Sequence, residues 1–123
     1  MHVNLVETPD ELIGLYSLIK KIPSIDLSTE LYMANAFTGR FKVYTLHDDE
    51  TLGPVGIALI DFSTPGNAHF VAVYAPKRGA EFMKLLKPIF KYWNCKTMSA
   101  VSRYNTENWH GLKRDYVVYK GDV

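Results

Sequence analysis

The stretch from Phe70 to Trp93, FVAVYAPKRGAEFMKLLKPIFKYW, decides how this chain folds. It opens with the apolar run Phe70–Tyr74, which indicates a buried strand. After a short loop, apolar side chains recur at helical spacing and form one face of an amphipathic helix: Phe82, Leu85, Leu86, Ile89, Phe90 and Trp93. Pro88 lacks the N–H that a helix interior needs, so we expect a kink there or an early end of the helix.

The loop at the head of this helix carries the candidate chemistry. Lys77 and Arg78 bring positive charge to it, and Gly79 lets the backbone approach a ligand closely. The N-terminus of a helix adds free N–H groups and a partial positive charge. Together these features predict a cradle for phosphate. The alternative is an ordinary basic loop between a strand and a helix.

Size and charge narrow the class of protein. The 123 residues suit one domain, which we expect to span residues 1–123. With 14 basic and 13 acidic residues the net charge is +1, which argues against a nucleic-acid-binding protein. Cys95 is the single cysteine, so no internal disulfide can form, and we expect a small buried apolar residue.

Several signals for particular sites and compartments are missing from the sequence. The chain has no membrane-length apolar run and no signal-peptide pattern, so we expect no membrane association and a cytoplasmic setting. The 4 histidines and the cysteine lack metal-ligand spacing, so we expect no metal site.

The residues before Phe70 predict a strand, two helices and three further strands. Thr8-Pro9-Asp10-Glu11 combines a capping box with proline at the first helical position, and Pro23 ends that helix. Ser28 caps the second helix. The expected strands are residues 2–7, 41–46, 55–62 and 68–74, and the second helix covers 29–37.

After Trp93 the chain predicts a strand, a short helix and a last strand, over residues 96–102, 106–113 and 115–120. The strand at 96–102 follows a helical crossover, so it should pair parallel to a neighbour. We therefore expect an α+β fold of three layers, in which a mixed, mostly antiparallel sheet of six strands has helices on both faces. The strand that ends at Tyr119 would leave an edge able to pair with a second copy, so a homo-oligomer is a possibility.

Two segments resemble the GCN5-related N-acetyltransferase (GNAT) family. Val73–Ala80, followed by Leu85 and Leu86, is similar to the family's strand–loop–helix signature, and Val101–Asn105 (VSRYN) is similar to its fifth strand and the asparagine after it. The resemblance implies acetyl-CoA as cofactor, with its pyrophosphate on the loop N–H groups and its pantetheine arm between the splayed fourth and fifth strands. The implied cofactor-binding residues are Val73, Lys77, Arg78, Gly79, Ala80 and Asn105.

In such an enzyme an amine attacks the thioester directly, and backbone N–H near Val73 would polarise the carbonyl. The candidate bases are His69, Asp61 and Glu30. Each residue has a structural role as the alternative: His69 as an ordinary strand residue, Asp61 as a turn-stabilising aspartate and Glu30 as a carboxylate at a helix start. For the general acid, Leu112 stands where the family has tyrosine, and Tyr104 is the nearby candidate.

Other departures support a second hypothesis. Aligned on Gly79, Pro76 and Glu81 replace family residues of the loop, and a carboxylate at Glu81 is unfavourable beside a phosphate unless it turns away. A single strand after the last helix would also leave the family's final hairpin truncated. The run 105–113 (NTENWHGLK) resembles internal virion proteins of short-tailed phages.

Two functions therefore stay open. One is an N-acyltransferase that acts on a small amine or a protein amine. The other is an inactive protein of the same fold that binds a protein partner or virion components, in the host cytoplasm or the virion.

Overall fold

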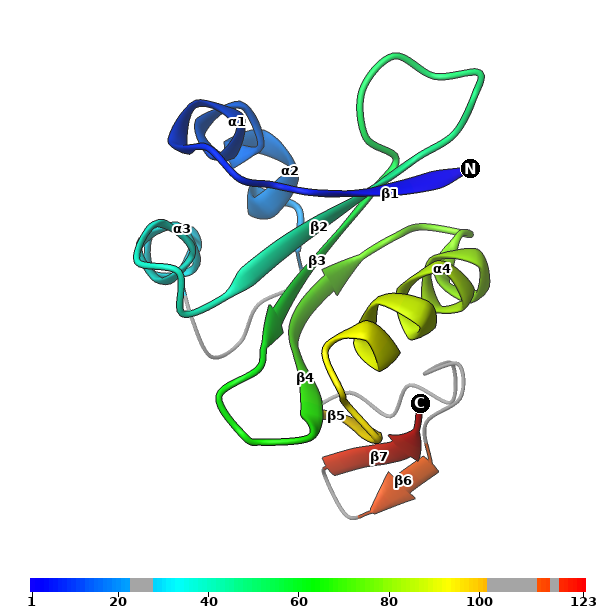
Figure 1. Ribbon diagram of the computed structural model, residues 1–123. Helices are drawn as coiled ribbons and strands as arrows, with labels where there is room; N and C mark the ends of the chain where they lie inside the picture. Colours follow the sequence, from blue (N-terminus) through cyan, green and yellow to red (C-terminus); the bar gives the residue numbers. More distant parts are fainter. Residues whose placement is uncertain (23–27, 102–112, 116–117) are drawn as a thin grey trace.

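The computed structural model describes residues 1–22, 28–101, 113–115 and 118–123 (Figure 1). Within them, one sheet of seven strands has the order β1-β2-β3-β4-β5-β7-β6. The strands are β1 (His2–Leu5), β2 (Lys42–His47), β3 (Gly56–Asp61), β4 (Asn67–Tyr74), β5 (Thr97–Val101), β6 (Lys113–Asp115) and β7 (Val118–Asp122). Neighbours pair antiparallel except β4 and β5, which are parallel as predicted.

The helices lie on both faces of the sheet, so the predicted three-layer α+β architecture is confirmed. Helices α1 (Pro9–Gly14), α2 (Tyr16–Lys20) and α3 (Thr29–Phe37) cover one face, and α4 (Gly79–Tyr92) covers the other (Figure 1). Each face has its own buried cluster. Leu12, Ile19, Tyr32, Ile57 and Leu59 belong to the first, and Leu46, Ile60, Phe70, Phe82 and Phe90 to the second.

The predicted first helix starts as expected but is broken. Thr8 caps it, since its Oγ1 accepts a hydrogen bond from the N–H of Glu11 at 3.2 Å. At Leu15 the backbone leaves helical geometry (φ −96°, ψ 1°), which divides the segment into α1 and α2. Leu12, Leu15 and Ile19 are all buried, so the break lets a short, bent segment keep its apolar side chains on the sheet.

Helix α4 runs through Pro88 to Tyr92, so the predicted early end is wrong. Leu86 and Phe90, which flank the proline, are buried on the sheet, whereas Pro88 lies on the exposed side. Burial of two large side chains outweighs the hydrogen bond that proline removes. The kink stays a prediction.

The C-terminal strands differ from the prediction. The run expected to form one strand is divided between β6 and β7, which pair antiparallel with Asp115 opposite Val118. An antiparallel pair of strands therefore occurs in a run of sequence that shows no turn signal. As a result β7 lies between β5 and β6, the final hairpin is present, and the sheet edge is β6 instead of the strand that contains Tyr119. Of the helix expected at 106–113, residues 106–112 lie outside the described residues, and Lys113 begins β6.

Two smaller expectations concern burial and the membrane. Cys95 is buried as predicted, and burial raises the pKa of its thiol. None of the helices in the described ranges has the length and apolar character needed to cross a bilayer.

Candidate functional site

The joint between β4 and α4 has the geometry of an anion-binding turn. The N–H of Arg78 donates to the carbonyl of Ala75 at 3.0 Å, and Lys77 adopts a left-handed conformation with φ 61°. The N–H of Phe82 donates to the carbonyl of Arg78 at 3.0 Å. The N–H groups of residues 79–81 therefore precede this first helical bond and face the helix end. We call residues 76–81 the cradle.

A carboxylate from another loop reaches the cradle. Asp48, in the loop between β2 and β3, lies 3.6 Å from the guanidinium of Arg78. Its Oδ1 accepts hydrogen bonds from the N–H groups of Thr51 at 2.7 Å and Glu50 at 3.2 Å. The bond from the Thr51 backbone is the main reason why the pKa of Asp48 is lowered, and Arg78 adds to it.

An open cavity of about 620 Å³ lies beside this ion pair. Its charged lining consists of Arg78, Lys77, Asp48 and Lys21, which follows α2. Glu81, which the sequence suggested would repel a phosphate, is exposed in the first turn of α4.

The strands that lead to the cradle separate. The pairing of β4 with β5 runs from Asn67 opposite Thr97 to Phe70 opposite Ala100. Beyond Phe70, β4 continues to Tyr74 without a ladder partner in β5. Val71 is an extra residue in β4, since Ala72 pairs with Leu59 and Phe70 with Ile60. Beyond Phe70 and Ala100 the described parts of β4 and β5 therefore no longer pair, and we call this unpaired stretch along residues 71–74 the gap.

At the closed end of this gap lies a chain of polar side chains, which we call the apex: Asn67 and His69 of β4 and Thr97 and Ser99 of β5. Nδ1 of His69 lies 2.8 Å from Oγ of Ser99. Nδ2 of Asn67 donates to the same Oγ at 3.0 Å, and Oγ1 of Thr97 donates to Oδ1 of Asn67 at 2.9 Å. Partial burial lowers the pKa of His69, although the Asp61 carboxylate opposes this shift.

Asp61 is paired with His69 across β3 and β4. Its Oδ1 accepts a hydrogen bond from the N–H of Ser63 at 2.8 Å. Burial on its own would raise the pKa of Asp61, but Ser63, Arg40 and His69 outweigh it, and the pKa is lowered. Asp61 therefore has the predicted turn-stabilising contact and also lies beside His69.

The remaining predicted residues are placed as follows. Glu30, in the first turn of α3, accepts a hydrogen bond from the hydroxyl of Tyr16 at 3.2 Å on the exposed surface. Val73 pairs with Ala58 of β3 and lies beyond the ladder of β4 with β5, and Gly79 and Ala80 begin α4. Tyr104 and Asn105 lie outside the described residues.

The sequence reading missed Asp48, Asn67, Thr97 and Ser99. For the apex there was a signal. In a parallel pair of strands, the alternation of NAHF (67–70) and TMSA (97–100) places Asn67 beside Thr97 and His69 beside Ser99. For Asp48 there was none, since its contact with Arg78 depends on how a loop folds.

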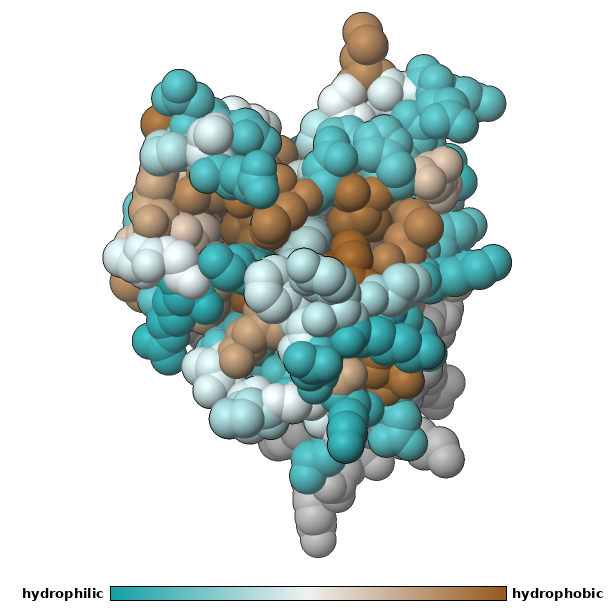
Figure 2. Space-filling model, in the orientation of Figure 1, coloured by the Kyte–Doolittle hydropathy of each residue, from teal (hydrophilic) through white to brown (hydrophobic). Residues whose placement is uncertain are grey.

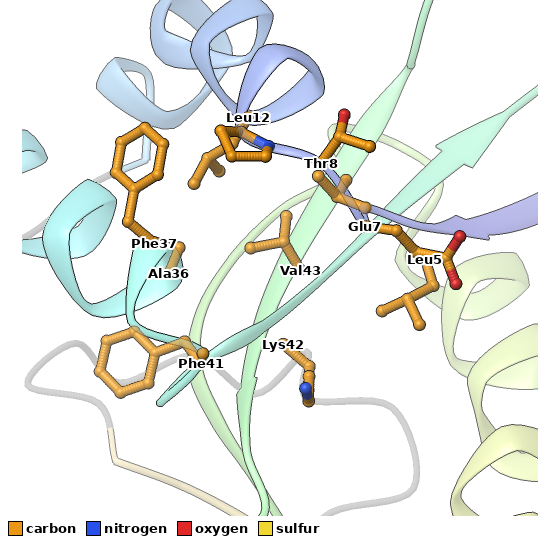
Figure 3. A pocket seen from close by; sticks show the side chains of 12 residues that line it. Leu5, Glu7, Thr8, Leu12, Ala36, Phe37, Phe41, Lys42 and Val43 are labelled. Carbon is orange, nitrogen blue, oxygen red and sulfur yellow. The ribbon is translucent and has the colours of Figure 1, made fainter.

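A second cavity, of about 320 Å³, lies at the other end of β2 and away from the cradle. In Figure 3, the cavity is surrounded by Leu12 of α1, Phe37 of α3, Val43 of β2 and Phe41, which precedes β2, and Glu7 lies at its margin. Figure 2 shows apolar surface gathered on this face of the molecule, between more polar rims. Among the described residues no cluster of histidine, cysteine and carboxylate side chains could hold a metal ion.

No family model matches the sequence. No curated protein matches it either. Solved structures do match. GCN5 of Tetrahymena is 15% identical with a TM-score of 0.65, covering 99% of this chain and 96% of that one. An acetyltransferase of Bacillus subtilis in complex with CoA is 16% identical with a TM-score of 0.65, covering 99% and 98%. A spermidine N-acetyltransferase chimera from Vibrio cholerae and hSSAT is 14% identical with a TM-score of 0.64, covering 99% of this chain and 96% of that one.

The chain therefore has the GNAT fold, as the sequence resemblance implied. At these identities the likeness concerns the fold. The resemblance to phage internal virion proteins has no support in these comparisons and stays a prediction.

Proposed function

We propose that this protein is an acyl-CoA-dependent N-acyltransferase that transfers an acetyl group to an amine. One observation carries the proposal: among the described residues, β4 continues beyond its ladder with β5 along residues 71–74, directly to the cradle. A ligand with an extended polar arm and a pyrophosphate at one end has the shape and charge that such a gap and cradle suit. The fold similarity to a CoA-bound acetyltransferase supports the same ligand.

The length of the gap also fits. The pantetheine arm, from phosphate to sulfur, is about as long as four residues of extended chain, roughly 14 Å. Counted back along β4 from Tyr74, four residues reach Phe70, where the pairing with β5 begins. With the pyrophosphate at the cradle, the thioester would lie near the apex and close to His69.

The chain's own groups supply the chemistry as follows. N–H groups of Gly79 and Ala80, with the side chains of Lys77 and Arg78, bind the pyrophosphate. With the thioester near the apex, Val73 lies along the pantetheine arm, and backbone N–H of β4 beside Val71 polarises the thioester carbonyl. The amine nitrogen bonds to the carbonyl carbon, the carbon–sulfur bond breaks, and the amine proton leaves as the thiolate departs.

Calorimetric titration with acetyl-CoA and with CoA tests the proposal. We expect micromolar binding that weakens about 10- to 100-fold in Arg78→Ala, because a charged hydrogen bond contributes about 1.5–3 kcal/mol. Lys84→Ala removes an exposed cation of the same helix beyond its first turn and is the matched control. No binding of either ligand at millimolar concentration would overturn the enzyme proposal. Binding would lead to a screen of small amines and protein amines as acceptors.

A second candidate function is a catalytically inactive interaction protein on the same fold. The ion pair of Arg78 with Asp48 favours it, because the cradle's arginine already has an anionic partner. Glu81 adds a carboxylate to the first turn of α4. Pull-down with the full chain would then search for a protein partner, virion components included.

A further inference from the structure

The hydrogen bonds at the apex have a direction that can be worked out from the donors and acceptors. Oδ1 of Asn67 can only accept and Nδ2 can only donate. Thr97 has one hydroxyl proton and two acceptors within reach, Oδ1 of Asn67 at 2.9 Å and the carbonyl of Gly66 at 3.5 Å. The shorter contact is the stronger one, so Thr97 donates to Asn67. Nδ2 of Asn67 is thereby turned towards Ser99, to which it donates.

This direction determines the role of Ser99. Its Oγ accepts a hydrogen bond from Nδ2 of Asn67, so its own hydroxyl proton needs a different acceptor. Nδ1 of His69, 2.8 Å away, is the group in contact with Ser99 that can accept this proton. When Ser99 donates to Nδ1, that nitrogen has no proton, and neutral His69 carries its proton on Nε2.

The charge environment agrees with a neutral ring. Partial burial lowers the pKa of His69, which disfavours the imidazolium, and the bond from Ser99 occupies the lone pair that a proton would need. Asp61, opposite His69 on β3, is the described carboxylate that pulls the other way.

We propose that Ser99 is a positioning residue that, through Asn67 and Thr97, holds His69 in the Nε2–H tautomer, so that His69 acts as a neutral hydrogen-bond donor and not as the general base. The role towards substrate rests on the proposed acyl transfer. There Nε2–H would donate to the oxygen or sulfur on which negative charge develops as the thioester is attacked. The proton of the amine then passes to an acceptor other than His69, such as water.

The tautomer can be measured without any ligand. Ring nitrogen NMR of the histidine-labelled full chain, with His69 assigned by its loss in His69→Gln, should show Nε2 protonated and Nδ1 unprotonated at neutral pH. Ser99→Ala should convert His69 to a mixture of tautomers, and Ser99→Thr, which keeps a hydroxyl on a strand, should restore the original spectrum. Thr64→Val, in the exposed turn before β4, removes a nearby hydroxyl and should change nothing.

A proton on Nδ1 in the unmodified protein would overturn the proposal, as would an unchanged His69 spectrum in Ser99→Ala. Because this measurement uses the free protein, a failure to bind acetyl-CoA would reject the proposed function separately and remove the substrate role of His69, whereas the tautomer result would still hold.

Acyl transfer gives the second readout. We expect His69→Ala to lower kcat about 100-fold with little change in KM, because one transition-state donor is lost. His69→Gln keeps an N–H donor but cannot act as a base, so it should retain activity to within about tenfold. Equal losses in the two variants would show that His69 is the base and would reject the donor role.

Discussion

The two ends of the gap between β4 and β5 differ in how they are built. At the cradle, the N–H groups of residues 79–81 are fixed by the helix, and side chains such as Lys77 are exposed. At the apex, the proposed function depends on side chains in register on paired strands, above all on His69 with Ser99. A cradle made of backbone tolerates unusual residues such as Pro76, whereas the apex does not. The departures of residues 76–81 from the family's loop motif are therefore weak evidence against ligand binding.

The largest expected difference between the two ends is in stability. Phe70 is the last β4 residue paired with β5, is 2% exposed, and packs edge-on against Phe90 with 5.6 Å between ring centroids. Phe70→Ala should lower the free energy of unfolding by about 3–5 kcal/mol. Lys77→Ala, at the exposed cradle, should change it by less than about 0.5 kcal/mol. Urea denaturation compares them, and similar losses would mean that the cradle is part of the core.

The next prediction concerns the ion pair at the cradle. Asp48→Asn should tighten acetyl-CoA binding about two- to fivefold, because it frees Arg78 and removes a negative charge near the phosphates. Asp49→Asn, which removes the same charge from the neighbouring exposed residue, is the control for a general change in charge. Calorimetry measures both variants. Weaker binding in Asp48→Asn would show instead that Asp48 holds Arg78 in its binding position.

Backbone strain gives a smaller effect. Lys77 has φ 61° and Asn94, after α4, has φ 58°. Left-handed geometry is costly for lysine and milder for asparagine. Lys77→Gly should raise the free energy of unfolding by up to about 1 kcal/mol, the part of the strain that exceeds glycine's extra entropy in the unfolded chain. Asn94→Gly should raise the free energy of unfolding by less. A clear loss of stability in Lys77→Gly, measured by urea denaturation, would mean that the lysine side chain holds the turn.

The smallest expected effect is a pH dependence that belongs to the apex. The pKa of His69 is lower in the folded state than in the unfolded chain, mainly through burial. As pH falls below about 6.5, the unfolded chain therefore binds a proton first, and stability is lost until the pH passes the folded pKa. Denaturation at pH 7.5 and 5.5 should show a smaller loss in His69→Gln than in the unmodified protein. His47, whose pKa is also lowered, mainly by burial, contributes the same trend in both proteins and cancels in the comparison.

Much of this fold could be predicted because it depends on local periodicity. The apolar face of α4, the Thr8 cap and the parallel β5 are all readable from neighbouring residues. The bend at Leu15 and the reversal between β6 and β7 were not, since tertiary packing decides them. At the site, the sequence predicted the cradle's elements and named His69. The sequence analysis missed Asp48, because its contact depends on how a loop folds, and Ser99, because its place beside His69 follows only once the register of β4 and β5 is known.

The extra residue in β4, Val71, also constrains how the protein can change its length. Residues before and after it break the simple alternation: Phe70 and Val73 pack on the α4 side, whereas Ala72 and Tyr74 pack towards α1–α3. Deleting Val71 would remove the bulge and restore strict alternation with Tyr74 on its present face, whereas inserting one more residue would turn the second half of the strand over and carry Tyr74 to the opposite layer. Insertions and deletions elsewhere in the surface loops would leave the gap intact. Among homologues, the length of this strand should therefore be more conserved than the amino-acid sequence of the loop that follows it.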